Sequence, residues 1–140
     1  MTQIRTTSSG QWFMRVLWLG IAVNLALAVG VIAAPAFMLT LNRLPPAEPL
    51  LWPRFAALLL VLLSIFYMPA GIDPDRYRAN AWMAVGSRLA GVVFFLVFQD
   101  AVYRNLGLVD LVFFIPEALL LTMAVRAAGA TPAPTRAHAV

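Results

Sequence analysis

Long apolar stretches separated by short polar breaks organise this chain. Apolar residues dominate four segments, at about residues 16–41, 54–70, 80–102 and 106–126. A helix needs roughly 20 mostly apolar residues to cross the hydrocarbon core of a bilayer, with a range that begins near 17. Each segment therefore has enough length to span. The pattern predicts an all-α integral membrane protein, folded as a four-helix transmembrane bundle.

The bundle accounts for most of the chain, so we expect one domain over residues 16–126. Residues 1–15 are polar at their start and predict a short cytoplasmic leader. Residues 127–140 are rich in Ala, Pro and Thr without hydrophobic periodicity, which is typical of a tail that does not fold alone. The breaks between the helices carry proline, glycine or charge, which favour turns.

The arginines are distributed unequally between the two sides of the predicted bundle. Positive residues near the ends of membrane helices concentrate on the cytoplasmic side. Placing the N-terminus inside puts six arginines in the cytoplasm and three outside, so we expect both termini to be cytoplasmic. The inner set is Arg5, Arg15, Arg76, Arg78, Arg126 and Arg136, and the outer set is Arg43, Arg54 and Arg104.

Composition narrows the classes of function that we expect of this protein. The chain is 62% hydrophobic and 11% charged, and every basic side chain is an arginine. The arginines are dispersed and form no basic stripe, so we expect no nucleic-acid partner. Cysteine is absent and His138 is the single histidine. We therefore expect no disulfide framework, no zinc or iron–sulfur site, no bis-histidine haem, and no enzyme.

Two opposite charges fall inside the last two apolar segments. Arg88 lies sixteen residues before Arg104, and Glu117 lies thirteen residues after it. At about 1.5 Å of rise per helical residue, antiparallel helices would bring these side chains to depths that differ by about 5 Å. A charge at the bilayer centre costs roughly 2.5–3.5 kcal/mol or more and therefore needs a partner. We predict a buried polar pair, Arg88–Glu117, with Asn24 and Ser64 at the same depth completing its hydrogen bonds.

The same residues allow other interpretations. A structural pair would fix the register of the helices, whereas a functional site would bind a proton or a substrate at Glu117. Arg88 argues against a cationic substrate there, because it would neutralise the carboxylate. A third interpretation is a cleft for a bound quinone or lipid, lined by Phe94, Phe95, Phe98, Phe113 and Phe114.

A second polar feature is the compact turn before the third apolar segment. It reads Asp73-Pro74-Asp75-Arg76-Tyr77-Arg78. Pro74 suits the first turn of a helix, and Asp73 suits the N-cap before it. This turn is either a capped connection at the headgroup surface or a docking site for a partner, formed by Asp73, Asp75, Arg76, Tyr77 and Arg78.

Residues 54–96 resemble small, uncharacterised bacterial four-helix membrane proteins of the DoxX-like and BphX-like groups. The resemblance depends on Arg54, the region of Tyr67, the turn at residues 73–78, and Arg88. It covers about a third of the chain and contains no catalytic signature. It implies a four-helix bundle in the bacterial inner membrane, and it implies no activity.

From these features we expect a non-catalytic accessory subunit of a larger bacterial membrane complex, such as a redox or photosynthetic one. Its partners would be membrane lipids and other membrane subunits, and it would hold no cofactor of its own. The alternative is a small proton-coupled or small-molecule transporter that uses Arg88 and Glu117.

Overall fold

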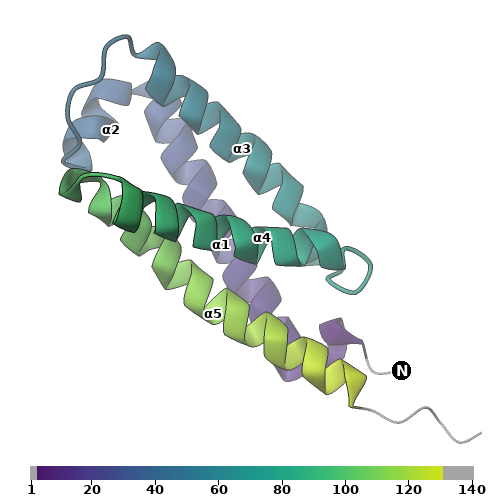
Figure 1. Ribbon diagram of the computed structural model, residues 1–140. Helices are drawn as coiled ribbons and strands as arrows, with labels where there is room; N and C mark the ends of the chain where they lie inside the picture. The colour runs from purple at the N-terminus through teal and green to yellow at the C-terminus, as the bar shows by residue number, and fades with distance from the viewer. Residues whose placement is uncertain (1–2, 131–140) are drawn as a thin grey trace, which may run out of the picture.

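The computed structural model describes residues 3–130, which form helices joined by short turns (Figure 1). Four helical segments are long and apolar enough to span a membrane, at Ser8–Ala33, Leu51–Ile72, Arg78–Phe98 and Ala101–Gly129. The predicted all-α fold with four transmembrane segments is therefore confirmed. The elements in chain order are η1 (Ile4–Thr6), α1 (Ser8–Ala33), α2 (Pro35–Leu41), α3 (Leu51–Ile72), α4 (Arg78–Val93), the π-helix η2 (Phe94–Phe98), η3 (Ala101–Tyr103) and α5 (Arg104–Gly129).

The helices run up and down, so the start of α1, the α3–α4 turn and the end of α5 lie at one end of the bundle (Figure 1). The central helix is α1, which packs against both α3 and α5. In turn α4 packs against α5, and it makes a smaller contact with α3. The α3 and α4 helices diverge toward the other end, where α2 and the 42–50 loop lie (Figure 1).

The first apolar segment is two helices, where the sequence pattern suggested one run over residues 16–41. The α1 helix begins within the expected leader, because the Thr7 hydroxyl accepts a hydrogen bond from the Gly10 amide and caps it. It ends at Ala33, and Pro35 begins α2. Proline disfavours helical geometry in the residue before it, and Ala34 accordingly leaves the helix with φ −138° and ψ 66°.

The other helix ends also differ from the expected ones. The α3 helix extends to Ile72 with Pro69 inside its last turn, so that proline does not end the helix. The third segment ends at Phe98, and residues 99–103 form the turn to α5. The α5 helix extends to Gly129, into the expected tail, whereas residues 131–140 lie outside the described part of the chain.

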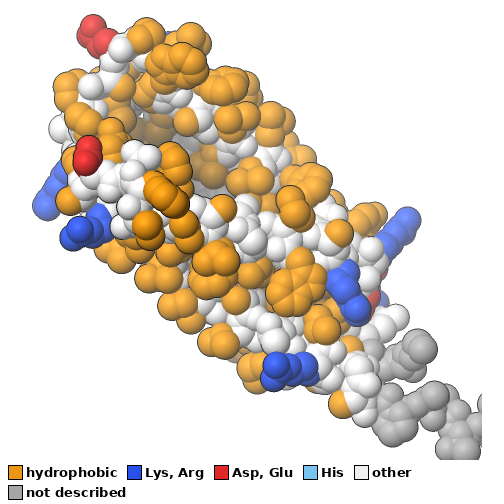
Figure 2. Space-filling model, in the orientation of Figure 1, with side chains coloured by type: hydrophobic (Ala, Val, Ile, Leu, Met, Phe, Trp, Pro, Cys, Tyr) orange, Lys and Arg blue, Asp and Glu red, His pale blue; other side chains and the backbone are white. Residues whose placement is uncertain are grey.

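The half of the bundle near the termini has a closed apolar core. Small side chains let the helices approach closely there, and larger ones fill the remaining space. The core consists of Phe13, Leu17, Ile21, Tyr67, Ala70, Ala81, Ala84, Val85 and Leu121. Large apolar side chains also cover the flank of the molecule, with arginines near its two ends (Figure 2). This distribution suits a hydrocarbon layer around the middle of the bundle.

Replacement of Gly107 by alanine is expected to destabilise the bundle. A Cβ atom there would lie 2.7 Å from Leu96 Cγ and 3.0 Å from Phe95 Cβ, so η2 would have to move away from α5. Overpacking of this kind costs about 1–3 kcal/mol. The measurement is thermal and denaturant unfolding of the purified chain in detergent.

Gly86→Ala is the matched control, because a Cβ atom at Gly86 meets nothing within 4 Å. Since alanine favours a helix over glycine by about 0.5–1 kcal/mol, this variant should be as stable as the original chain or slightly more stable. Equal stability of the two variants would contradict the close packing of α5 against η2.

Candidate functional site

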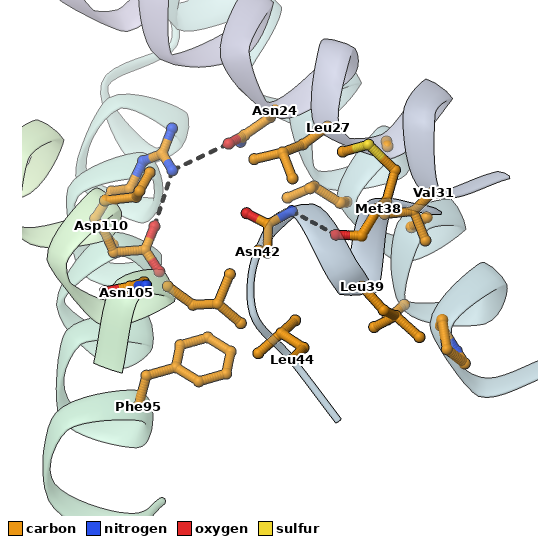
Figure 3. Close-up of a pocket in the computed structure, with 18 residues that line it drawn as sticks. Asn24, Leu27, Val31, Met38, Leu39, Asn42, Leu44, Phe95, Asn105 and Asp110 are labelled. Carbon is orange, nitrogen blue, oxygen red and sulfur yellow. Dashed lines mark hydrogen bonds and ion pairs between the residues drawn. The ribbon is translucent and has the colours of Figure 1, made fainter. Parts of the chain in front are cut away.

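A cavity of about 360 Å³ lies in the half of the bundle away from the termini. Side chains of α1, α2, α3, α4, η2, α5 and the 42–50 loop line it (Figure 3). The space-filling view is hollowed at this end, between α3, the end of α4 and the start of α5 (Figure 2). The walls of the cavity are mostly apolar. The cavity volume falls in the range of small-molecule pockets, about 300–1,000 Å³. Apolar wall residues include Leu27, Val31, Met38, Leu39, Leu60 and Leu106.

The cavity ends at a buried arginine that joins three helices. Arg88 of α4 donates from Nη1 to Asp110 Oδ1 of α5 at 2.9 Å and to Asn24 Oδ1 of α1 at 3.1 Å (Figure 3). The Arg88 side chain is 6% exposed and the Asp110 side chain is 20% exposed. The polar end of the cavity therefore consists of an ion pair with one amide, of which Asp110 is the most accessible charged group.

The expected partner of Arg88 was wrong, because the ion pair forms with Asp110 and not with Glu117. Depths counted from the turn at residues 99–103 do not explain the difference. Arg88 lies ten residues, or about 15 Å, from the end of η2, whereas Asp110 and Glu117 lie about 9 and 20 Å along α5. Arg88 is therefore at a level between the two carboxyl groups, and depth alone does not select its partner.

Glu117 is fully buried, and neither of its oxygens has a hydrogen-bond partner among residues 3–130. Arg88 Nε and Nη2 also lack partners within that range. The two groups face each other across Gly20 of α1. A Cβ atom at Gly20 would lie 2.8 Å from Arg88 Nη2 and 3.3 Å from Glu117 Oε1. The absence of a side chain at Gly20 thus leaves the space between them open.

Ser64 and Tyr67, which lie near the same depth, form hydrogen bonds that do not involve Arg88. Ser64 is buried, and its hydroxyl donates to its own helix at Leu60 O, 2.7 Å away, so it does not complete the bonds of Arg88 as expected. Tyr67 of α3 forms a hydrogen bond with Ser87 of α4. Of Asn24 and Ser64, the two residues expected to complete the hydrogen bonds of Arg88, only Asn24 does so.

The expected phenylalanine cleft is not a single surface. Phe95 lines the cavity, whereas Phe94 and Phe98 are exposed on the outside. Phe113 is buried beside the arginine, with the Arg88 guanidinium carbon 5.0 Å from the centre of its ring. Phe114 packs against the closed core. A bound quinone or lipid would therefore contact the cavity walls and not a stack of five rings.

The charged turn at residues 73–78 lies at the opposite end of the bundle from the cavity and binds the chain's own N-terminal segment. Asp75 accepts hydrogen bonds from the Ile4 and Arg5 amides at 2.8 and 3.0 Å. Asp73 Oδ1 accepts from the Asp75 and Arg76 amides, both at 3.2 Å, so it caps this turn. The helix itself begins at Arg78, four residues after the first turn suggested at Pro74 and two residues before the expected segment over 80–102. Arg76, Tyr77 and Arg78 are exposed.

Comparisons with protein-family models, with curated proteins and with solved structures find no match to this chain. The resemblance to DoxX-like and BphX-like proteins therefore stays a prediction. Within the described residues, no three His, Asp or Glu side chains come together in a group that could hold a metal ion. The site must be interpreted from its own geometry.

Sequence reasoning missed the role of Asp110, although its spacing from Glu117 contained a signal. The two carboxylates are seven residues apart and share one face of α5, so either could meet an arginine on the neighbouring helix. Asn42 and Asn105 also line the cavity, and nothing in the sequence pattern indicated that they would. Their positions depend on how the 42–50 loop and the start of α5 pack.

Removing Arg88 tests its pairing with Asp110. Arg88→Met leaves Asp110 unpaired, and removal of one partner of a buried pair costs roughly 3–5 kcal/mol. Adding Asp110→Leu should recover most of this free energy of unfolding, whereas adding Glu117→Leu, a matched change on the same helix, should recover less. Unfolding in detergent measures all three variants. Better rescue by Glu117→Leu would show that the assigned partner is wrong.

Proposed function

We propose that this protein is a small-molecule carrier of the membrane, which takes a small amphiphile into the cavity. The observation that carries the proposal is the combination of apolar walls with a polar end at Arg88, Asp110 and Asn24. An amphiphile fits this arrangement, because its apolar part would contact the walls and its polar head would reach the buried pair. Pockets that bind small molecules typically combine a mostly apolar lining with a few placed polar groups.

The proposed membrane is the bacterial inner membrane, with both termini in the cytoplasm. In this orientation the cavity opens on the outer side, and the apolar core around Phe13, Leu17 and Leu121 closes the inner side. A carrier alternates between states that are open to one side at a time. On this proposal the cavity would belong to the state open to the outer side, and transport would require the core half to open in another state.

A bulky side chain in the cavity tests the proposal with a neutral probe, a photoreactive decanol analogue. We expect this probe to label cavity residues such as Leu27 and Met38 in the original chain. Leu106→Trp should abolish most of that labelling, because Leu106 lines the cavity. Mass spectrometry of the labelled peptides is the measurement.

The matched control is Leu108→Trp, two residues along the same helix, where the side chain is 46% exposed on the outside. It should leave labelling of the cavity unchanged. Equal labelling of all lipid-facing helices, with no effect of Leu106→Trp, would contradict a binding cavity.

A second candidate is the accessory subunit of a larger membrane complex, with redox or photosynthetic complexes as examples. One observation favours it. The outer face of α4 carries a shallow apolar groove over Gly86 and Ala90, which are four residues apart. Small residues at this spacing let membrane helices pack closely.

The subunit hypothesis predicts that other chains co-purify in a fixed ratio after gentle extraction from native membranes. Gly86→Leu, which fills the groove, should release those chains without changing the stability of the purified protein, because the position is open. Mass spectrometry of the co-migrating chains measures this. Purification of the protein alone, with or without the substitution, would contradict the subunit function.

A further inference from the structure

The guanidinium of Arg88 lies between two carboxyl groups of the same helix. It is paired with Asp110, on the cavity side, through Nη1. Its Nη2 faces Glu117, on the core side, across Gly20. Seven residues separate the two carboxyl groups along α5, which is about two helical turns. A single arginine therefore has two carboxyl groups within reach, and it is paired with one of them.

Charge neutrality assigns a proton to Glu117 in this arrangement. Arg88 and Asp110 cancel each other, so an ionised Glu117 would be a fully buried, unpaired charge. Such a charge is expensive in a membrane interior, and a buried carboxyl group without a charged partner takes up a proton instead. The titratable groups close enough to act on it are Arg88 from α4, Asp110 from α5 and Tyr67 from α3, whereas α1 contributes the uncharged Gly20.

We propose that the cavity exchanges an organic cation with an ammonium head for the proton of Glu117. This inference rests on the proposed carrier function and names its substrate class. The sign of the charge follows from accessibility, since Asp110 is the group that the cavity exposes. Arg88 Nε and Nη2 are buried, so the donor without a partner that remains for an anion is the uncharged amide of Asn24, Nδ2.

The exchange keeps the site neutral at each stage. Before it, Arg88 pairs with the Asp110 carboxylate, and Glu117 carries its proton. The ammonium head then replaces Arg88 at Asp110, and the guanidinium turns across Gly20 toward Glu117. The O–H bond of Glu117 breaks, the proton leaves to water, and the resulting carboxylate pairs with Arg88. One cation enters and one proton leaves, so the sum of charges does not change.

Gly20 and Gly91 make this movement sterically feasible. Gly20 leaves room for the guanidinium between its two acceptors. Gly91 of α4 lies directly against the Asp110 carboxylate, so closely that a Cβ atom there would overlap it. The carboxylate is thus held against backbone on one side, and it accepts from Arg88 with its other oxygen. An ammonium head can approach this carboxylate from the cavity, where its side chain is partly exposed.

The test uses three probes with the same chain, decylammonium, decanol and decanoate, added to the purified full chain in weakly buffered detergent at mildly acidic pH. Calorimetry measures binding, and a pH indicator measures proton release. We expect decylammonium to release one proton per bound molecule. Decanol should bind without release, and decanoate should bind more weakly than decylammonium.

Two variants test whether Glu117 releases the proton and whether Asp110 binds the cation. Glu117→Gln removes the titrating group, so proton release should disappear and decylammonium binding should weaken about tenfold or more, because the site would then gain an uncompensated charge. Asp110→Asn should abolish decylammonium binding but not decanol binding. Asp100→Asn changes an exposed carboxylate outside the cavity and should behave as the original chain. Circular dichroism and gel filtration check that each variant is folded.

The probes separate failure of this inference from failure of the carrier function. Binding of decanol and decylammonium without proton release would overturn the exchange and leave the carrier function intact. Tighter binding of decanoate than decylammonium would overturn the substrate class. If none of the three binds to the folded original chain, both the exchange and the carrier function are wrong.

Discussion

The requirement that a buried arginine be paired organises this bundle. Arg88 lies in a helix with apolar surroundings, where an unpaired charge would cost several kcal/mol. Its ion pair with Asp110 and hydrogen bond to Asn24 connect α4, α5 and α1 at one level. The cost of dehydrating such a pair makes its net contribution to stability small. The pair instead fixes how the three helices meet, and it provides the polar group that a ligand can bind.

The cluster of Arg88, Asp110 and Asn24 divides the bundle into two unlike halves. Toward the termini, large and small apolar side chains fill the interior around Tyr67 and Leu121. Toward the other end the helices diverge, and α2 with the 42–50 loop encloses a cavity instead of a packed core (Figures 1 and 3). A protein that needed only stability would gain from filling that space, because a cavity costs free energy. The unfilled half therefore supports the proposal of a ligand.

The four membrane helices could be predicted from hydropathy alone, because the bilayer sets the length of an apolar segment. Their ends could not, since Pro35 divides one apolar run and the Thr7 cap begins a helix in polar sequence. Burial of Arg88 and Glu117 could be predicted from their positions in the apolar segments. The choice of Asp110 as partner could not, because Arg88 lies at a level between the two carboxyl groups of α5. The cavity had no signal in the sequence, because the packing of a proline-rich loop determines it.

Infrared spectroscopy of the purified chain tests the central claim most directly, because a protonated carboxylic acid has a C=O stretching band that a carboxylate lacks. The neutral cluster proposed here requires one buried acid of this kind beside an ionised Asp110. The account predicts a band that is slow to shift in D₂O, disappears in Glu117→Gln and also disappears when decylammonium is bound. A band that persists in Glu117→Gln, or the absence of any such band in the ligand-free protein, would contradict it.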